Sequence, residues 1–520
     1  MSFIPTLDIA NLIKLFALAI TLLYIYHLYY QTKHWPPGPR GLPILGNIFQ
    51  VPRFSWYTFT NWKVQYGSII SLNIVGQPMI ILNTHKVASE LLNRRSQIYS
   101  DRPRFIMAGE ILSGGLNIIL LSPTDRWRRM RRAGHEGFKA RASEKYRPIQ
   151  ELEATRLVTN LINDPENWSN HFNRSAASSI LCSVYGRDPI ERKDDYIVEK
   201  INTMMDRLVH AAFPGAYLVE IFPRMKHLPL WMAKWKREGQ EHFTKDTNMF
   251  ERFLSDVGER MLTGNCKPCF ASSLLDNQSK AKLTNEEASW LAGAIFGAGS
   301  ETTSSVLHVF LLAMTLYPDV MRTAQTEIDG VVGPDRLPNF GDFDQLPYIQ
   351  AMVKEVLRWR PVIPLGFPRC AAENDFYEGY HIPRGAIVVP NVWAMNRDPD
   401  LYPDYDEFRP GRFLNDSGGI NQVFSDLAPL GHVTFGFGKR ICSGLNLANQ
   451  SLFINFACML WALNIEQAID NEGKRIVPSR TACIDRGIVA KPAPFVCNIT
   501  IRSNNAIATV VEQMKADKKA

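Results

Sequence analysis

The stretch Phe435–Gly444, FGFGKRICSG, is the part of this 520-residue chain that best indicates its fold and chemistry. Gly436 and Gly438 allow the backbone to turn tightly and to come close to a flat ligand, because glycine carries no side chain. Cys442 lies between these glycines and an apolar stretch, 445–463, that is expected to form a helix. The sequence therefore predicts a loop that presents a thiol to a bound group.

The surroundings of Cys442 favour its ionised form. Lys439 and Arg440 precede the cysteine, and the expected helix follows it. Positive charges and a helix N-terminus both lower the pKa of a thiol. We therefore expect a thiolate here, although a cysteine taken by itself is more often a buried structural residue.

The fixed positions of this stretch make the interpretation specific. They match the pattern Phe-x-x-Gly-x-Arg-x-Cys-x-Gly at Phe435, Gly438, Arg440, Cys442 and Gly444. The stretch thereby resembles the heme-binding signature of the cytochrome P-450 family. The resemblance implies that Cys442 is the proximal ligand of the heme iron, that Arg440 pairs with a heme propionate, and that the loop residues Phe435, Gly436 and Gly438 contact the cofactor. A thiolate on heme iron favours cleavage of the O–O bond of dioxygen.

A second motif, AGSET at 298–302, lies in the middle of a long helix predicted over Asn285–Leu316. It is similar to the oxygen-activation motif of the same family. The resemblance implies that Gly299 leaves room beside the iron and that Thr302 hydrogen-bonds bound oxygen or a water. Glu301 would relay protons from solvent, as a general acid. The alternative is that the Thr302 hydroxyl bonds back to its own helix.

Glu355 and Arg358 form a Glu-x-x-Arg motif on one face of a predicted helix. The resemblance to the cytochrome P-450 family implies that this pair is buried. It also implies that an arginine from a later loop, here Arg412, joins the pair. The usual glutamate of that loop is Gly411 in this sequence. We expect these residues to hold the fold around the heme and to take no part in the chemistry.

Three further residues resemble the propionate-binding set of the family. Trp127 and Arg131, four residues apart, project from one helix face. Arg369 matches another arginine of that set. An arginine suits this role because its guanidinium donates two parallel hydrogen bonds to a carboxylate.

The remaining arginines of the segment DRWRRMRR form a basic cluster of Arg126, Arg128, Arg129 and Arg132. The simplest interpretation is a solvated helix face. A second is a docking surface for an acidic electron-donor protein, since opposite charges raise the association rate. A nucleic-acid site ranks third, because no nucleic-acid-binding motif accompanies the cluster, and we expect no nucleic-acid partner.

The composition is that of an ordinary globular protein, with 46% hydrophobic and 21% charged residues and a net charge of +7. This excludes a mainly disordered or low-complexity chain, and eight cysteines are too few for a disulfide scaffold. A β-hairpin is predicted over 68–83 and a strand region over 383–390. The resemblance implies a mainly α-helical heme-thiolate fold with a minor β-sheet, over residues 41–502, before a charged, solvated tail, 503–520.

Residues 1–33 are expected to form an N-terminal membrane anchor, since 9–30 are almost entirely apolar and long enough to span a bilayer as a helix. Positive residues follow this run, which places the rest of the chain on the cytosolic side, and the endoplasmic reticulum membrane is the expected location. A cleaved signal peptide and a buried core helix are the alternatives. A Pro-rich hinge, 34–40, separates the anchor from the body.

The resemblance implies a monooxygenase that inserts one atom of O2 into a hydrophobic small molecule, with a terpenoid or sterol of fungal secondary metabolism as our guess. Electrons would come from NADPH through a flavoprotein reductase, with a cytochrome b-type protein as a second possible donor. A heme-thiolate isomerase, dehydratase or peroxygenase is the first alternative, and the acid–alcohol pair Glu301–Thr302 argues against it. A non-catalytic heme sensor is the second.

Overall fold

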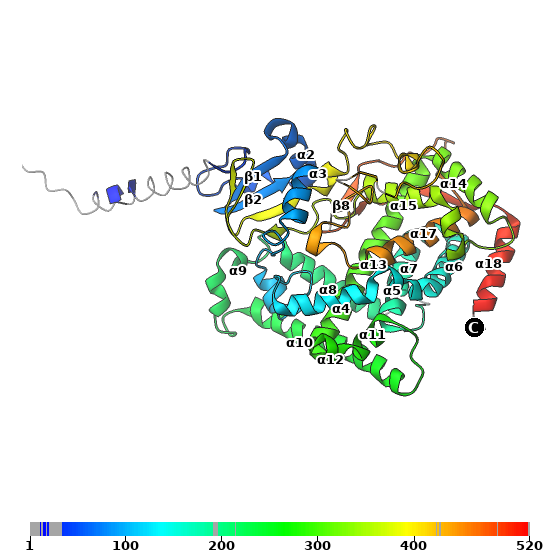
Figure 1. Ribbon diagram of the computed structural model, residues 1–520, viewed down its shortest axis with the longest axis horizontal. Coiled ribbons are helices and arrows are strands. Elements are labelled where there is room, and N and C mark those ends of the chain that lie inside the picture. Colours follow the sequence, from blue (N-terminus) through cyan, green and yellow to red (C-terminus); the bar gives the residue numbers. More distant parts are fainter. Residues whose placement is uncertain are drawn as a thin grey trace, which may run out of the picture.

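The computed structural model describes residues 11, 14–16, 18–19, 34–190, 196–213, 215–422, 424–425, 428–485 and 487–517. Over these ranges the fold is mainly helical with small β-sheets, as predicted (Figure 1). The helices are α2 (Ser55–Tyr66), α3 (His85–Ala88), α4 (Asp125–Phe138), α5 (Ala140–Ser143), α6 (Arg147–Asn163), α7 (Trp168–Tyr185), α8 (Tyr196–Ala212), α9 (Leu218–Ile221), α10 (Lys234–Leu262), α11 (Phe270–Asp276), α12 (Gln278–Ala281), α13 (Asn285–Leu316), α14 (Pro318–Val331), α15 (Pro347–Trp359), α16 (Val392–Met395), α17 (Leu445–Ala462) and α18 (Asn504–Asp517). Shorter turns used below are the π-helical η2 (Ser89–Arg94) and η3 (Ile106–Ile111) and the 3-10 turns η6 (Pro223–His227) and η9 (Gly438–Arg440).

The strands are β1 (Ile69–Ile74), β2 (Gln77–Leu82), β3 (Arg369–Cys370), β4 (Asp375–Tyr377), β5 (Tyr380–Ile382), β6 (Ile387–Pro390), β7 (Leu463–Gln467), β8 (Cys483–Asp485), β9 (Ala490–Pro492) and β10 (Cys497–Ile501). The main sheet has the order β1-β2-β6-β3, and the hairpin predicted over 68–83 is its antiparallel pair β1–β2. The strand predicted over 383–390 begins only at Ile387, because Gly385 with a φ of +83° forms a turn before it. Figure 1 shows β1, β2, α2 and α3 gathered at one end of the molecule.

The centre of the helical part is α13, which has the bounds predicted from the sequence. Thr284 Oγ1 accepts the N–H of Glu287, and the Glu287 carboxylate accepts the N–H of Thr284, so a capping box fixes the start of the helix. The C-terminal half of α13 packs in one apolar core with α6, α7, α14, α15 and α17. This burial makes α13 the axis around which the other helices are arranged.

The Glu355–Arg358 pair is buried as predicted, with both side chains fully inaccessible to solvent. Arg358 Nε lies 2.6 Å and Nη2 2.8 Å from the two carboxylate oxygens of Glu355. Arg412 joins them at 3.3 Å from Glu355 Oε1, and the N–H of Arg409 donates to the same oxygen. The carboxylate therefore links α15 to the loop that precedes the cysteine stretch, and Gly411 leaves this link intact.

Two terminal segments differ from the expected spacer and tail. In the segment 34–40, expected to be a hinge, Pro37 O accepts the N–H of Ser71 at 3.0 Å and Pro36 O accepts its hydroxyl at 2.5 Å, so this segment is fixed against β1. Residues 504–517, expected to be a solvated tail, form α18, in which Val510 is only 1% exposed. Apolar residues at helical spacing, Ile507 and Val510, explain why this segment folds onto α6 and α17.

The predicted membrane anchor lies almost wholly outside the described residues. Among those that are described, no helix alone has the length and apolar character needed to cross a membrane. Within the described ranges, α13 and α14 taken together reach that length and hydropathy, and they are bent by 104° at their junction. Since both contribute to the buried core, their hydrophobicity is explained by packing.

Candidate active site

The cysteine loop is folded by hydrogen bonds within it and by two glycines in the left-handed region. The N–H of Cys442 donates to Phe435 O at 2.9 Å, and the N–H of Gly436 donates to Val433 O at 2.9 Å. Gly436 and Gly438 have φ values of +78° and +51°, which side chains disfavour. A Cβ at Gly438 would lie 2.3 Å from Leu92 O, so only glycine lets the loop lie this close to η2.

Cys442 lies deep in the fold, yet its side chain is accessible to solvent, so its sulfur is available to a ligand. Burial raises the pKa of the thiol, while the N–H of Gly444 and the charge of Arg131 oppose this effect. The expected lowering by Lys439 and Arg440 is therefore wrong. The Arg440 guanidinium instead donates to Ser100 O at 2.8 Å and Leu121 O at 2.5 Å. A metal ion bound to this sulfur would favour its ionised form, since metal coordination deprotonates a thiol.

Four arginines meet beside the cysteine loop and donate mainly to backbone carbonyls. Arg440 lies over the ring of Trp127, 4.2 Å from its centroid, and Arg131 donates to Ile441 O. Arg369 Nη2 lies 2.6 Å from Phe437 O, and Arg102 Nη1 lies 2.6 Å from Pro368 O. The structure thus brings the predicted residues Trp127, Arg131, Arg369 and Arg440 together at the cysteine loop.

This cluster carries more positive charge than its surroundings neutralise. Among the described residues, none of the four guanidiniums forms an ion pair with a carboxylate. Burial lowers the pKa of Arg102 and of Arg440, and the charge of Asp101 only partly offsets this effect. Burial, with smaller effects from Arg102 and Arg369, lowers the pKa of Arg440 to about 8. Burial and Arg102 lower the pKa of Arg369 to about 9. Buried cations without a counter-ion are unfavourable, so the cluster is suited to a bound dianion.

The residues present fit a heme. Its propionates supply the anionic groups that the four arginines lack, and the Cys442 sulfur supplies an iron ligand. Arg102, 8% exposed, was not predicted from the sequence. Its segment, Asp101–Arg104, has no pattern that distinguishes it, and only the fold places it against 367–368.

The middle of α13 has one face that remains accessible although most of the helix is buried. Ile295, Ala298 and Thr302 lie on this face, at positions i, i+3 and i+7. The Thr302 hydroxyl donates to Ala298 O at 2.7 Å, which is the alternative contact considered from the sequence. Its lone pairs remain free to accept a hydrogen bond, because a hydroxyl both donates and accepts.

Gly299 has a packing role between two helices. A Cβ at this position would lie 2.8 Å from Cγ1 of Ile180, on α7. The glycine therefore allows α13 and α7 to pack closely, and its expected place beside the iron stays a prediction. Gly293 and Gly297 act in the same way, since a Cβ there would collide with Phe250 and Met205.

Two segments far apart in sequence, η3 and α9, are joined by hydrogen bonds. Glu220 on α9 accepts the N–H of Met107 at 2.7 Å and of Ile106 at 3.0 Å, so it caps the start of η3. Lys226 on η6 donates to Glu110 at the end of η3. Therefore η3 is bonded to α9 at its start and to η6 near its end.

Comparison with known proteins agrees with this site. A family model described as Cytochrome P-450 matches residues 36–495. Cytochrome P-450 monooxygenase 58 of Postia placenta is 55% identical over 483 residues, covering 92% of this chain and 91% of that protein. A cytochrome P-450 monooxygenase of Armillaria gallica is 46% identical, covering 92% of each chain, and one of Amanita muscaria is 37% identical with the same coverage. These matches over nearly the whole length show that the chain belongs to the cytochrome P-450 family of heme-dependent monooxygenases, which are oxidoreductases.

Proposed function

We propose that this protein inserts one atom of O2 into a hydrophobic small molecule, terpenoid or sterol-like, in fungal secondary metabolism. Electrons would be supplied by NADPH through a flavoprotein reductase. The observation that carries the proposal is the accessible Cys442 residue beside four arginines, of which Arg102 and Arg369 are buried and Arg131 and Arg440 half-buried. None of the four forms an ion pair within the part of the chain that the structure describes. We expect the substrate to contact residues 105–120, 208–219, 292–302 and 362–367. Partly buried apolar side chains on these segments, among them Phe105, Ile118 and Ile363, favour an apolar ligand.

We expect one group of side chains in the site to bind the cofactor and another to transfer protons. When bound, the heme supplies the redox chemistry by which dioxygen is activated. Cys442 would hold the iron as a thiolate, and Arg102, Arg131, Arg369 and Arg440, with Trp127, would hold the propionates. Thr302 Oγ1 is fixed by its bond to Ala298 O and would accept or pass on a proton from that fixed position. Glu301, partly exposed one residue earlier, would exchange protons with solvent.

Thr302 provides a test of this function. In a reconstituted system with reductase and substrate, Thr302→Ala should keep the reduced, carbon monoxide-bound spectrum of a thiolate-ligated heme. It should form less product per NADPH consumed, by a factor on the order of 10². Thr302→Ser keeps the hydroxyl and should stay close to the wild type. Equal yields from the alanine variant and the wild type would contradict the proton-handling role.

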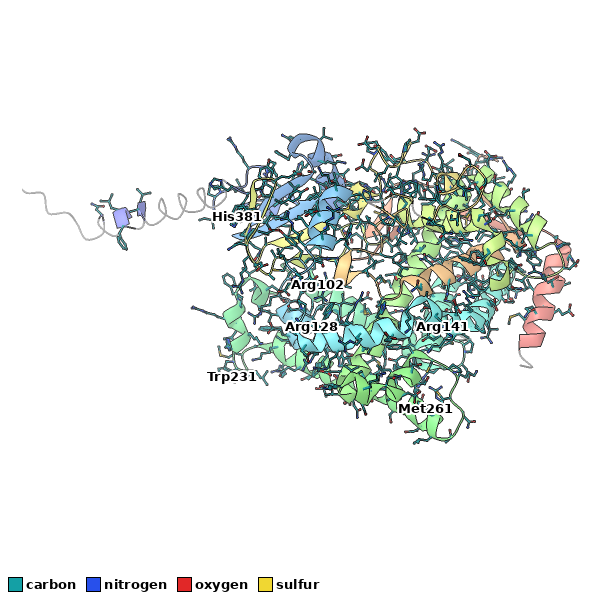
Figure 2. All side chains as sticks on the ribbon, in the orientation of Figure 1. Arg102, Arg128, Arg141, Trp231, Met261 and His381 are labelled. Atoms are coloured by element: carbon teal, nitrogen blue, oxygen red, sulfur yellow. The ribbon has the colours of Figure 1, made fainter. Side chains whose placement is uncertain are left out.

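We propose the exposed arginines of α4 as part of the reductase-docking surface. Arg126 and Arg129, predicted within this surface, instead pair with Glu287 at 3.0 and 2.9 Å, and Glu287 is only 4% exposed. Arg128 and Arg132 are exposed, and among the described residues neither forms an ion pair (Figure 2 labels Arg128). These two are therefore the arginines of α4 available to an acidic partner.

Reversing these charges should weaken the interaction with the reductase. The double variant Arg128→Glu/Arg132→Glu should raise the apparent KM for reductase about threefold or more at low ionic strength, with the heme spectrum unchanged. Lys474→Glu/Arg475→Glu changes the net charge equally on an exposed turn and serves as the control. The same KM in both double variants would place the docking surface elsewhere.

We propose that the chain is anchored in the endoplasmic reticulum membrane by one helix within 1–33, with its catalytic part in the cytosol. Exposed apolar side chains at 218–232 support contact with lipid, since Leu218 and Phe222 are 59% exposed and Trp231 is 78% exposed (Figure 2). The full chain should stay with membranes after alkaline carbonate extraction, and a chain without 1–33 should be released in larger part. Release of the full chain under these conditions would exclude a spanning anchor.

A further inference from the structure

The cysteine loop is held by three side chains from outside it. Arg369 donates to Phe437 O at 2.6 Å, and Arg131 donates to Ile441 O. Asn93 Oδ1 accepts the N–H of Gly438 at 2.7 Å. The two arginines also belong to the cationic cluster, whereas Asn93 is uncharged and lies on the exposed surface. The arginines can be explained by binding of the cofactor propionates, but the contact of uncharged Asn93 with the loop cannot.

The π-helical turn η2 brings Asn93 to the loop. Gly438 lies directly against this turn, since a Cβ there would be 2.3 Å from Leu92 O and 3.2 Å from Ser96 Cβ. Arg369 Nη1 approaches the same Leu92 O at 3.4 Å. The backbone of η2 and the loop are thus in contact, and Asn93 supplies the hydrogen bond across this contact.

The Asn93 amide is oriented by a second bond. Its Nδ2 donates to Ser89 Oγ, four residues earlier, at 3.3 Å. The nitrogen of the amide is thereby directed to the hydroxyl and the oxygen to the N–H of Gly438. Without such an orientation the side chain could turn away to solvent.

The hydrogen bond from Gly438 to Asn93 satisfies an N–H group for which the loop itself offers no side-chain acceptor. Gly438 begins η9, and Phe437 before it provides no side-chain cap. The first N–H groups of a helical turn have no partner within that turn. Two residues after η9 comes Cys442, whose N–H is bonded back to Phe435 O. A displacement of η9 would therefore also move the Cys442 sulfur.

We propose that Asn93 is a positioning residue, which holds η9 through the Gly438 N–H and so fixes Cys442 as an iron ligand. This role rests on the proposed heme-thiolate function. Without the bond, the loop opens more often and Cys442 is held less firmly as a ligand. The Asn93 side chain acts through the loop, since its hydrogen bonds go to Gly438 and Ser89.

The experiment compares Asn93→Ala and Asn93→Asp with Arg94→Ala in the holoenzyme. Aspartate keeps an oxygen acceptor, and Arg94, 80% exposed on the same turn, has no bond to the loop. The first readout is the rate at which the reduced, carbon monoxide-bound spectrum converts from the thiolate to the neutral-thiol form in mild urea. Asn93→Ala should convert about fivefold faster than the wild type, and Asn93→Asp and Arg94→Ala within about twofold of it.

Hydrogen–deuterium exchange of the ferric holoenzyme gives the second readout. The peptide containing 435–444 should exchange faster in Asn93→Ala and unchanged in Arg94→Ala, because only the first variant frees the Gly438 N–H. Equal conversion rates and equal exchange in these two variants would overturn the proposal, as would a change confined to the KM for reductase. A wild-type spectrum without the thiolate form would instead overturn the proposed function itself.

Discussion

Replacing Glu355 with alanine is expected to reduce the yield of heme-loaded protein to below about a tenth of the wild type. The change leaves Arg358, which has no solvent-accessible side-chain surface, without its carboxylate, and Arg412 loses the same partner. A buried charge without its partner costs about 3–5 kcal/mol, a large part of the ~5–15 kcal/mol that stabilises a domain. The ratio of heme to protein absorbance after purification measures the effect.

A surface ion pair provides the control for Glu355. Glu136 pairs with Lys139 at the exposed end of α4, and its side chain is 60% exposed. Glu136→Ala should leave the yield of heme-loaded protein unchanged. Normal yield and normal thermal unfolding of Glu355→Ala would show that the buried pair does not hold the fold together.

The substitution Cys442→Ser is expected to abolish both the spectrum of a thiolate-ligated heme and product formation. A serine hydroxyl is far less acidic than a thiol and provides no sulfur to the iron. The reduced, carbon monoxide-bound spectrum and substrate turnover are measured on the same preparation. Cys266→Ser, a partly exposed cysteine in the loop before α11, is the control and should match the wild type. Turnover that persists in Cys442→Ser would exclude this sulfur as the iron ligand.

The parts of the fold that could be predicted from the sequence are those set by nearby residues. The bounds of α13 follow from the capping residue Thr284 and from Pro318, and both lie next to the helix ends. The hairpin β1–β2 follows from two β-branched runs around one turn. The cysteine loop was recognisable because its fixed residues lie within ten positions of one another.

What could not be predicted depends on contacts between distant segments. Arg102 joins the cationic cluster only because the fold brings it to 367–368. The pairing of Arg129 with Glu287 crosses 158 positions, and the packing of Gly299 against Ile180 joins two helices. The pKa of the Cys442 thiol was predicted with the wrong sign because its burial is a property of the folded chain.

The carboxylate of Glu220 has a consequence for changing the substrate range of this enzyme by exchanging segments with a relative. Its two hydrogen bonds to the start of η3 hold residues 106–111 and 218–221 in a fixed relative position, although more than a hundred positions separate the two segments. If only one segment were exchanged, the N–H groups at the start of η3 and the carboxylate that accepts them would come from different proteins. Chimeras should therefore inherit both segments from the same parent.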